Sequence, residues 1–461
     1  MVGSSISMFG SRISTVAFPM LVLYINNSPF ITGLVAFLVI APTMLVYMPA
    51  GVLVDRWNPR RVMLASELLR GLVIASVVVS LIMFGTHLSI GFLISAMVAE
   101  EVLEIFFTLA ERRYMSRLME RDNMASRQAY IEVRSHAVIL AGRPLGPFLF
   151  EISPFLPFLA DAVSFLFSAA SLAVIRQDDE PPATLQRVRP EKLVDHVGLF
   201  EDIGQGWNWL WKQRRALYTM ILMAGTSLVA QALILMFLSE AHSQKLSAFA
   251  IGIVLAASGT GGAAGSIFSR FLPARIRRHW LPIQMAAWCL ALAFLAVTGI
   301  LTVPGSVVAM LMLGLTGAIG NIEFGTYLVS NVPDVMIAKV TGIGQMLAIG
   351  ACALGPVIGG AAFQDFGSHT AIMFLLGIVA LLACVSLLAP EGNEASSRGA
   401  VTEPHGRDDA NRMESIAGSL AVAHDGHEQN HDAKGNFFWE TSENFPLMEN
   451  SRPLSTSSMA L

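Results

Sequence analysis

The chain has 461 residues, of which 54% are hydrophobic and only 14% are charged, and its mean hydropathy is +0.59. A water-soluble protein carries about 25% charged residues, so this composition excludes a soluble enzyme. The net charge of −4 supplies no basic surface that could bind a nucleic acid. We therefore expect the chain to fold in a lipid bilayer.

The three cysteines, Cys289, Cys352 and Cys384, all lie in apolar runs. They show neither a paired spacing nor a neighbouring histidine cluster, so we predict no disulfide, no metal site and no cofactor. The first apolar stretch continues into a full span without a cleavage site, so we also expect no cleavable signal peptide.

A spanning helix needs about 20 apolar residues to cross about 30 Å of hydrocarbon. Twelve such runs predict an all-α membrane protein. The predicted spans cover approximately residues 5–26, 33–54, 62–84, 89–111, 129–151, 155–176, 216–238, 247–271, 280–302, 305–327, 338–362 and 369–389.

Lysine and arginine gather in the connections that follow even-numbered spans, for example Arg112 and Arg113 after the fourth. The connections after odd-numbered spans contain only Lys245. Because cytoplasmic loops collect lysine and arginine, we expect both termini in the cytoplasm.

Composition also divides the chain into four parts. A long polar connection over 177–215 separates an N-terminal half, residues 1–176, from a C-terminal half, residues 216–390. The polar residues 391–461 have no helical or strand periodicity and are expected to form a disordered cytoplasmic tail.

The two halves share short sequences at nearly the same offset. The end of span 2, GVLVDR from residue 51, matches the end of span 8, GSIFSR from residue 265. A Leu-Gly-Pro triplet occupies the equivalent spans 5 and 11, with helix-shaping residues Gly146, Pro147, Gly355 and Pro356. Parallel repeats around a site at the midplane are a common plan of transporters.

The segment GVLVDRWNPRR from Gly51 to Arg61 resembles motif A, the loop between spans 2 and 3 of the major facilitator superfamily. Other stretches resemble its enterobactin-exporter-like and macrolide-efflux-like branch, namely GSRI from Gly10, DAVSF from Asp161 and VPD from Val332. The resemblance covers about residues 5–389. It implies twelve transmembrane helices in two pseudo-symmetric halves.

The resemblance also implies a role for motif A as a latch between the halves in one conformation. Its residues in this chain are Gly51, Asp55, Arg56, Arg60 and Arg61. The alternative is that the basic residues only anchor the loop to anionic lipid.

Ionisable residues inside spans are costly in the bilayer and mark candidate sites. Arg12 in span 1 and Glu104 in span 4 lie at similar depth with opposite charge, which predicts a pair in the cavity that these spans line in the superfamily. Glu100 and Glu101 lie one turn before Glu104, so span 4 presents a carboxylate cluster. Such a cluster cannot ionise fully without cost, which suits proton coupling; the alternative is that one glutamate only neutralises Arg12.

Two further pairs follow from position. Arg143 and Asp161 lie on neighbouring spans 5 and 6 and are predicted to hold that hairpin together, with a substrate contact by Arg143 as the alternative. Glu67 and Arg70, three residues apart in span 3, are predicted to satisfy each other. The candidate cavity residues of the C-terminal half are Gln231, Asn321 and Glu323.

These features predict a secondary active exporter and not an enzyme. Few fixed charges among aromatic and aliphatic residues suit a small amphipathic organic compound, such as a drug, a secondary metabolite or a siderophore. No Walker sequence is present, so proton antiport is the expected energy source. We expect a monomer in the cytoplasmic membrane, with the substrate, protons and the bilayer as its partners. A facilitator or importer, a lipid-flipping relative, and a membrane sensor or scaffold that uses the tail remain alternatives.

Overall fold

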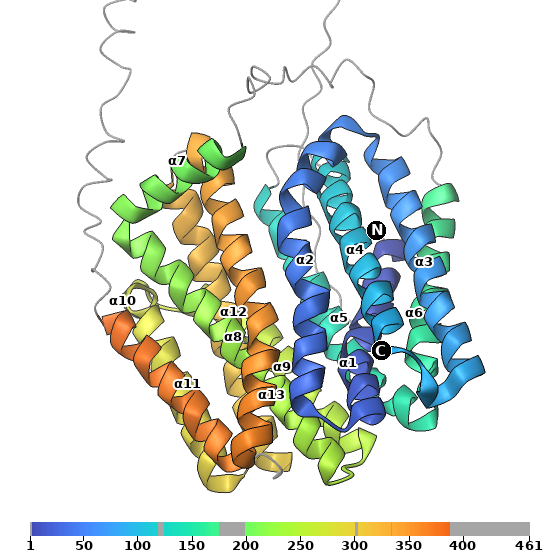
Figure 1. Cartoon of the computed structure of the whole chain (residues 1–461). Helices are drawn as coiled ribbons and strands as arrows, with labels where there is room; N and C mark the ends of the chain where they lie inside the picture. The colour runs from blue at the N-terminus through green and yellow to red at the C-terminus, as the bar shows by residue number, and fades with distance from the viewer. Residues whose placement is uncertain (1, 119–123, 175–198, 300–302, 333, 388–461) are drawn as a thin grey trace, which may run out of the picture. The chain divides into compact units, whose positions relative to one another are not determined.

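Every regular element is helical in the computed structural model, which describes residues 2–118, 124–174, 199–299, 303–332 and 334–387. Most of the predicted connection 177–215 and the whole predicted tail 391–461 lie outside these ranges. The first group of helices is α1 (Val2–Asn26), α2 (Pro29–Arg56), α3 (Pro59–Phe84), the 3₁₀ turn η1 (Gly85–His87), α4 (Ile90–Leu118), α5 (Met124–Ile152) and α6 (Leu156–Val174), drawn in blue to teal in Figure 1.

The second group is drawn in green to orange in Figure 1. It consists of α7 (Leu199–Lys212), α8 (Arg214–Ser243), α9 (Ala248–Phe268), the 3₁₀ turn η5 (Ser269–Phe271), α10 (Ala274–Arg278), α11 (Trp280–Thr298), α12 (Val303–Asn331) and α13 (Asp334–Leu387).

Nine helical segments in the described ranges are long and apolar enough to cross a membrane. The last of them runs from Lys339 to Leu387 and covers two predicted spans, which meet at Gly367, where the backbone is non-helical (φ 76°, ψ 173°). Glycine tolerates this conformation because it has no Cβ. The charge-bearing helices α4 and α5 are not among the nine, so the count of twelve spans stays a prediction.

Two α-helices of the described ranges lie outside the predicted spans, the short α10 and the longer α7. Helix α7, Leu199–Lys212, occupies the end of the polar connection and packs against α13 and α8. A Cβ on Gly206 would lie 2.9 Å from Ile343 Cδ1, so the absence of a side chain allows this close packing. The apolar residues of α7, among them three tryptophans, alternate with polar ones as in a short amphipathic helix that lies on the bundle.

The start of α3 explains an irregularity in motif A. The motif normally has a second glycine at the position of Asn58 or Pro59. Here the Asn58 side chain accepts hydrogen bonds from the backbone N–H groups of Arg60 (3.0 Å) and Arg61 (3.3 Å), and Pro59 is the first residue of the helix. Asparagine at the N-cap followed by proline at N1 is a favourable helix start, so the loop ends in a capped helix.

Each helix group has its own apolar core, one formed mainly by α1, α2, α3, α4 and α6 and the other mainly by α8, α9, α11, α12 and α13. The groups contact each other through α2 with α13, α5 with α9, and α1 with α8. Small residues allow close approach at these contacts. A Cβ on Gly33 of α2 would lie 2.3 Å from the Pro356 carbonyl oxygen, and one on Gly360 of α13 would lie 2.4 Å from that of Pro29.

The repeated glycines occupy equivalent places. A Cβ on Gly146 of α5 would lie 2.7 Å from the backbone oxygen of Ile13 on α1, the first helix of its group. A Cβ on Gly355 of α13 would lie 2.4 Å from the backbone oxygen of Leu228 on α8. Small residues let membrane helices pack backbone to backbone, so both glycines shape the same kind of helix contact. Pro147 follows Gly146 as a buried residue of α5.

Candidate functional site

A row of serines on α1 binds three buried carboxylates of the first helix group. Ser4, Ser7, Ser11 and Ser14 are three or four residues apart and therefore share one helix face. Ser4 hydrogen-bonds to Glu111, Ser7 donates to Glu67 at 3.1 Å, and Ser11 and Ser14 donate to Asp161. This serine face was not predicted, although the spacing of the four serines can be read from the sequence.

Arg70 is the centre of the charged network. Its guanidinium donates to Glu100 Oε1 from Nε (3.0 Å) and Nη2 (2.5 Å), and Nη2 also donates to Glu104 Oε2 (3.2 Å) and to Ser11 Oγ (3.0 Å). The guanidinium carbon lies 4.3 Å from the centre of the Phe165 ring, within cation–π range. The Arg70 side chain is only 3% exposed, so this ion pair is buried.

Two predicted pairs are therefore wrong. Glu104 pairs with Arg70 and not with Arg12, because Glu100 and Glu104, four residues apart on α4, both face α3. Glu67 does not pair with Arg70 at ion-pair distance; it accepts hydrogen bonds from Ser7 and from Ser168 at 3.1 Å. The predicted pairs rested on depth along a span, and depth does not say toward which neighbour a side chain points.

The predicted pair of Arg143 and Asp161 is also wrong. Asp161 is fully buried and accepts hydrogen bonds from Ser11, Ser14 and Ser164. Arg143 instead donates to Ser258 Oγ at 3.3 Å, on α9 of the other helix group. Helix α5 packs extensively against α9, so its arginine points away from α6.

A second buried ion pair was missed. Arg134 donates to both oxygens of Glu111, at 2.8 and 3.1 Å, and to Ser4 Oγ at 2.9 Å. Arg134 is 8% exposed, so this pair is buried as well. The pair ties α5 to α4 and α1 near the start of the chain.

Residues from both helix groups line a cavity of about 180 Å³. Most of the predicted charged and polar candidates border it, namely Arg12, Glu100, Glu101, Glu104, Arg143 and Gln231. The remaining wall combines three hydroxyl side chains with a larger set of apolar ones. The hydroxyls are Ser11, Ser14 and Thr15, and the apolar side chains include Phe18, Val39, Ile40, Met97, Ile234, Leu235 and Pro356. Six of the nine predicted site residues thus border this cavity, although several of them have other partners than predicted.

A second cavity of about 300 Å³ adjoins the first, since Arg143, Gln231 and Ile234 line both. It extends into the second helix group, where the predicted Asn321 lines it. Glu323 does not line either cavity; it pairs with Arg277 at 2.7 Å. Glu323 lies about two turns before the end of α12, and the sequence alone does not show whether such a position faces the cavity or a neighbouring helix end.

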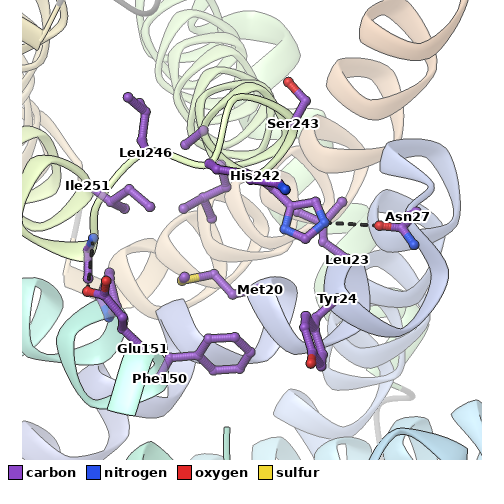
Figure 2. A pocket seen from close by; sticks show the side chains of 15 residues that line it. Met20, Leu23, Tyr24, Asn27, Phe150, Glu151, His242, Ser243, Leu246 and Ile251 are labelled. Atoms are coloured by element: carbon purple, nitrogen blue, oxygen red, sulfur yellow. Dashed lines mark hydrogen bonds between the residues drawn. The ribbon is translucent and has the colours of Figure 1, made fainter. Parts of the chain in front are cut away.

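A larger hollow, of about 610 Å³, lies where α1 and α5 end and α8 leads into α9 (Figure 2). His242 Nε2 lies 3.1 Å from Asn27 Oδ1, and Glu151 accepts a hydrogen bond from the backbone N–H of Ala248 at 3.3 Å. Ala248 begins α9, so the carboxylate also faces a helix N-terminus, where negative charge is favourable. Both bonds join the two helix groups at this end.

Comparison with known proteins identifies the family. The model of the Major Facilitator Superfamily matches residues 1–348 and 216–418. The chain belongs to this superfamily. The resemblance seen in motif A is thereby confirmed, and the chain is an integral membrane protein that transports a small molecule. The two overlapping matches are consistent with the internal repeat.

Individual relatives agree with this assignment. The chain is 24% identical over 404 residues to the multidrug efflux pump Tap of Mycolicibacterium fortuitum, covering 84% of this chain and 93% of that protein. The crystal structure of the nucleoside transporter NupG is similar, with a TM-score of 0.64 at 14% identity over 84% of this chain and 97% of that one. A bacterial homologue of the iron transporter ferroportin, in its inward-facing state, has a TM-score of 0.60 at 16% identity and the same coverage.

The superfamily's motif A lies at the junction of α2 and α3. The side chain of Asp55 lies outside the described residues, Arg56 and Arg61 are exposed, and a Cβ on Gly51 would meet no atom within 4 Å. Arg60 donates to the backbone oxygens of Leu172 (3.1 Å) and Ala173 (3.3 Å) in the last turn of α6. A cation there satisfies terminal carbonyls and complements the helix dipole, so Arg60 fastens α3 to α6 within one helix group.

Proposed function

We propose that the chain is a secondary active exporter of a small amphipathic organic compound, driven by proton antiport. The observation that carries the proposal is the cavity bordered by both helix groups, in which a carboxylate cluster lies against an apolar wall. The similarity to a multidrug efflux pump over most of both chains supports export as the direction.

Alternating access is the proposed mechanism. The residues that line the two adjoining cavities come from α1, α2, α4 and α5 and from α8, α9, α11, α12 and α13. A rocking motion of one six-helix half against the other would open this space to one side of the membrane at a time. We propose that these halves are residues 1–176 and 216–390, joined by 177–215 and followed by a disordered tail over 391–461.

Glu104 is the proposed coupling residue. Its side chain is 36% exposed and borders the cavity, while Glu100 on the same arginine is only 6% exposed. A proton from the cavity can therefore reach Glu104 first. Protonation would weaken its ion pair with Arg70, and because α3 carries Arg70 and α4 carries Glu104, this step would change the contact between two helices. Glu101, which also borders the cavity, is the next candidate.

We further propose that the chain lies in the cytoplasmic membrane as a monomer, with twelve spans and both termini in the cytoplasm. Asp55 would then stand at the cytoplasmic end of α2, where a carboxylate can bind across to the other half in the outward-facing state only. A bond set present in one conformer and absent from the other is what a conformational latch requires.

Dye loss from cells tests the proposed function. A bacterial strain lacking its own efflux pumps would express the full chain and be loaded with fluorescein or rhodamine 6G, which share a xanthene body and differ in charge. Faster loss of at least one dye than in cells with an empty vector, abolished by a protonophore, is the expected result. Dye loss that is unchanged by the protonophore would indicate a facilitator. Faster dye entry would indicate an importer, and no effect on any dye would favour a sensor or scaffold.

A further inference from the structure

The cavity contains two arginines that form no ion pair with its carboxylates in the described part of the chain. We infer that Arg12 and Arg143 together bind the acid group of the transported molecule, so that the substrate is an amphipathic organic anion with a carboxylate, sulfonate or phosphate. This inference rests on the proposed transport function, but not on its proton coupling.

Arg12 has unused hydrogen-bonding capacity. Among the described residues, its Nε is buried without a hydrogen-bond partner, and its charge acts on Glu100 and Glu101 electrostatically without an ion pair to either. It borders the cavity from α1. A guanidinium has five N–H donors in a planar fork that matches an acid group, and a buried donor left unpaired is costly.

Arg143 lies beside Arg12. Its neighbour Gly142 is packed so closely that a Cβ there would lie 2.9 Å from Arg12 Cβ, and the two guanidinium charges act on each other electrostatically. The hydrogen bond that the structure gives Arg143 is to the neutral hydroxyl of Ser258. Two like charges brought together in a low-dielectric space repel, and an anion between them would remove that repulsion.

Two of the three carboxylates that line the cavity form ion pairs with Arg70. Glu100 and Glu104 both bind Arg70, which lies behind the cavity wall and is not among its lining residues. Glu101 is therefore the one carboxylate of the lining that is left to balance its two cations, Arg12 and Arg143. The part of the wall formed by α1 and α5 is therefore positively charged. The cavity as a whole is not, because its three carboxylates lie on α4.

The adjoining cavity indicates what the rest of the substrate is like. It begins at Arg143 and continues along the apolar side chains of Met223, Ile234, Trp288, Met310 and Leu313. Three amides, Gln231, Gln284 and Asn321, interrupt this surface, and Gln284 Oε1 is buried without a hydrogen-bond partner. An acid group at the arginines with an apolar or aromatic body in this second cavity, carrying a hydrogen-bond donor, fits both surfaces.

Binding to the purified full chain in lipid nanodiscs tests the inference. Fluorescein, an anion, and rhodamine 6G, a cation on the same xanthene body, would be titrated while fluorescence anisotropy is followed. We expect saturable fluorescein binding that weakens about 10- to 100-fold in Arg12→Gln and in Arg143→Gln, the range for losing a charged hydrogen bond. Arg12→Lys should retain more of the affinity than Arg12→Gln, and Arg270→Gln, at an exposed position, should bind fluorescein as the wild type does.

Glu101→Gln separates the anion site from its rival, a cation site. If the substrate is an anion, removing this carboxylate should tighten fluorescein binding. No saturable fluorescein binding, or binding unchanged in Arg12→Gln, would overturn the inference, as would rhodamine binding that depends on Glu101. Arginine-dependent fluorescein binding without any transport in vesicles would leave the site standing and remove the proposed function. Export of rhodamine driven by the proton gradient, without any fluorescein binding, would keep the proposed function and remove the anion site.

Discussion

Replacing Arg70 by Met should destabilise the protein more than any single change among the residues that line the cavity. The side chains of Arg70 and Glu100 are 3% and 6% exposed, so the variant leaves a buried carboxylate without its cation. Breaking a buried ion pair in this way costs about 3–5 kcal/mol. Loss of the hydrogen bond to Ser11 and of the contact with the Phe165 ring acts in the same direction.

The assay is unfolding of the purified chain in mixed micelles as the denaturing detergent fraction rises, extrapolated to zero denaturant. A double-mutant cycle with Glu100→Leu isolates the pair, because removing both charges leaves neither one stranded. We expect Arg70→Met and Glu100→Leu to couple by about 1–3 kcal/mol, so that the double variant recovers part of the stability. A cost below about 1 kcal/mol for Arg70→Met, or strictly additive effects, would refute a network centred on Arg70.

Four further outcomes are expected. Asp55→Asn should insert normally but abolish transport, because the side chain keeps its size and loses the charge of the latch; normal efflux would exclude that role. Removing residues 391–461 should leave dye efflux near that of the full chain, and loss of efflux in an inserted truncation would favour the scaffold alternative. Glu104→Gln should bind substrate as the wild type does but lose its response to a pH gradient, whereas a retained response would direct attention to Glu101. Gly33→Val should lower transport by spreading α2 from Pro356, and cross-linking yield between α2 and α13 should fall; an unchanged yield would contradict that close contact.

The sequence was most informative about features that depend only on the order of residues along the chain. Hydrophobic runs predicted the nine helical segments of the described ranges that are long and apolar enough to cross a membrane. Motif A identified the superfamily, which the family comparison confirms. The Gly-Pro repeat was also informative, since Gly146 and Gly355 pack on equivalent helices. Each of these features is a property of position along the chain.

The sequence was least informative about which charged side chains bind each other. Arg12, Glu104, Arg143 and Asp161 were chosen because charges inside spans are costly, but the direction in which each side chain points depends on how the helices pack. Arg70 binds Glu100 and Glu104 because α3 lies against α4, and nothing in a single sequence fixes that contact. The serine face of α1 was overlooked because serine is common in membrane helices and carries no charge.

The central claim is that a proton gradient drives an organic substrate through the cavity. Its most direct test uses proteoliposomes that contain the full chain, a pH-sensitive dye in the lumen, and fluorescein or rhodamine 6G as substrate. The account predicts that substrate moves faster when a pH gradient is imposed, that adding substrate without a gradient moves protons in the opposite direction, and that Glu104→Gln abolishes both effects. Substrate flux that is equal with and without the gradient, with no accompanying change in lumenal pH, would contradict it.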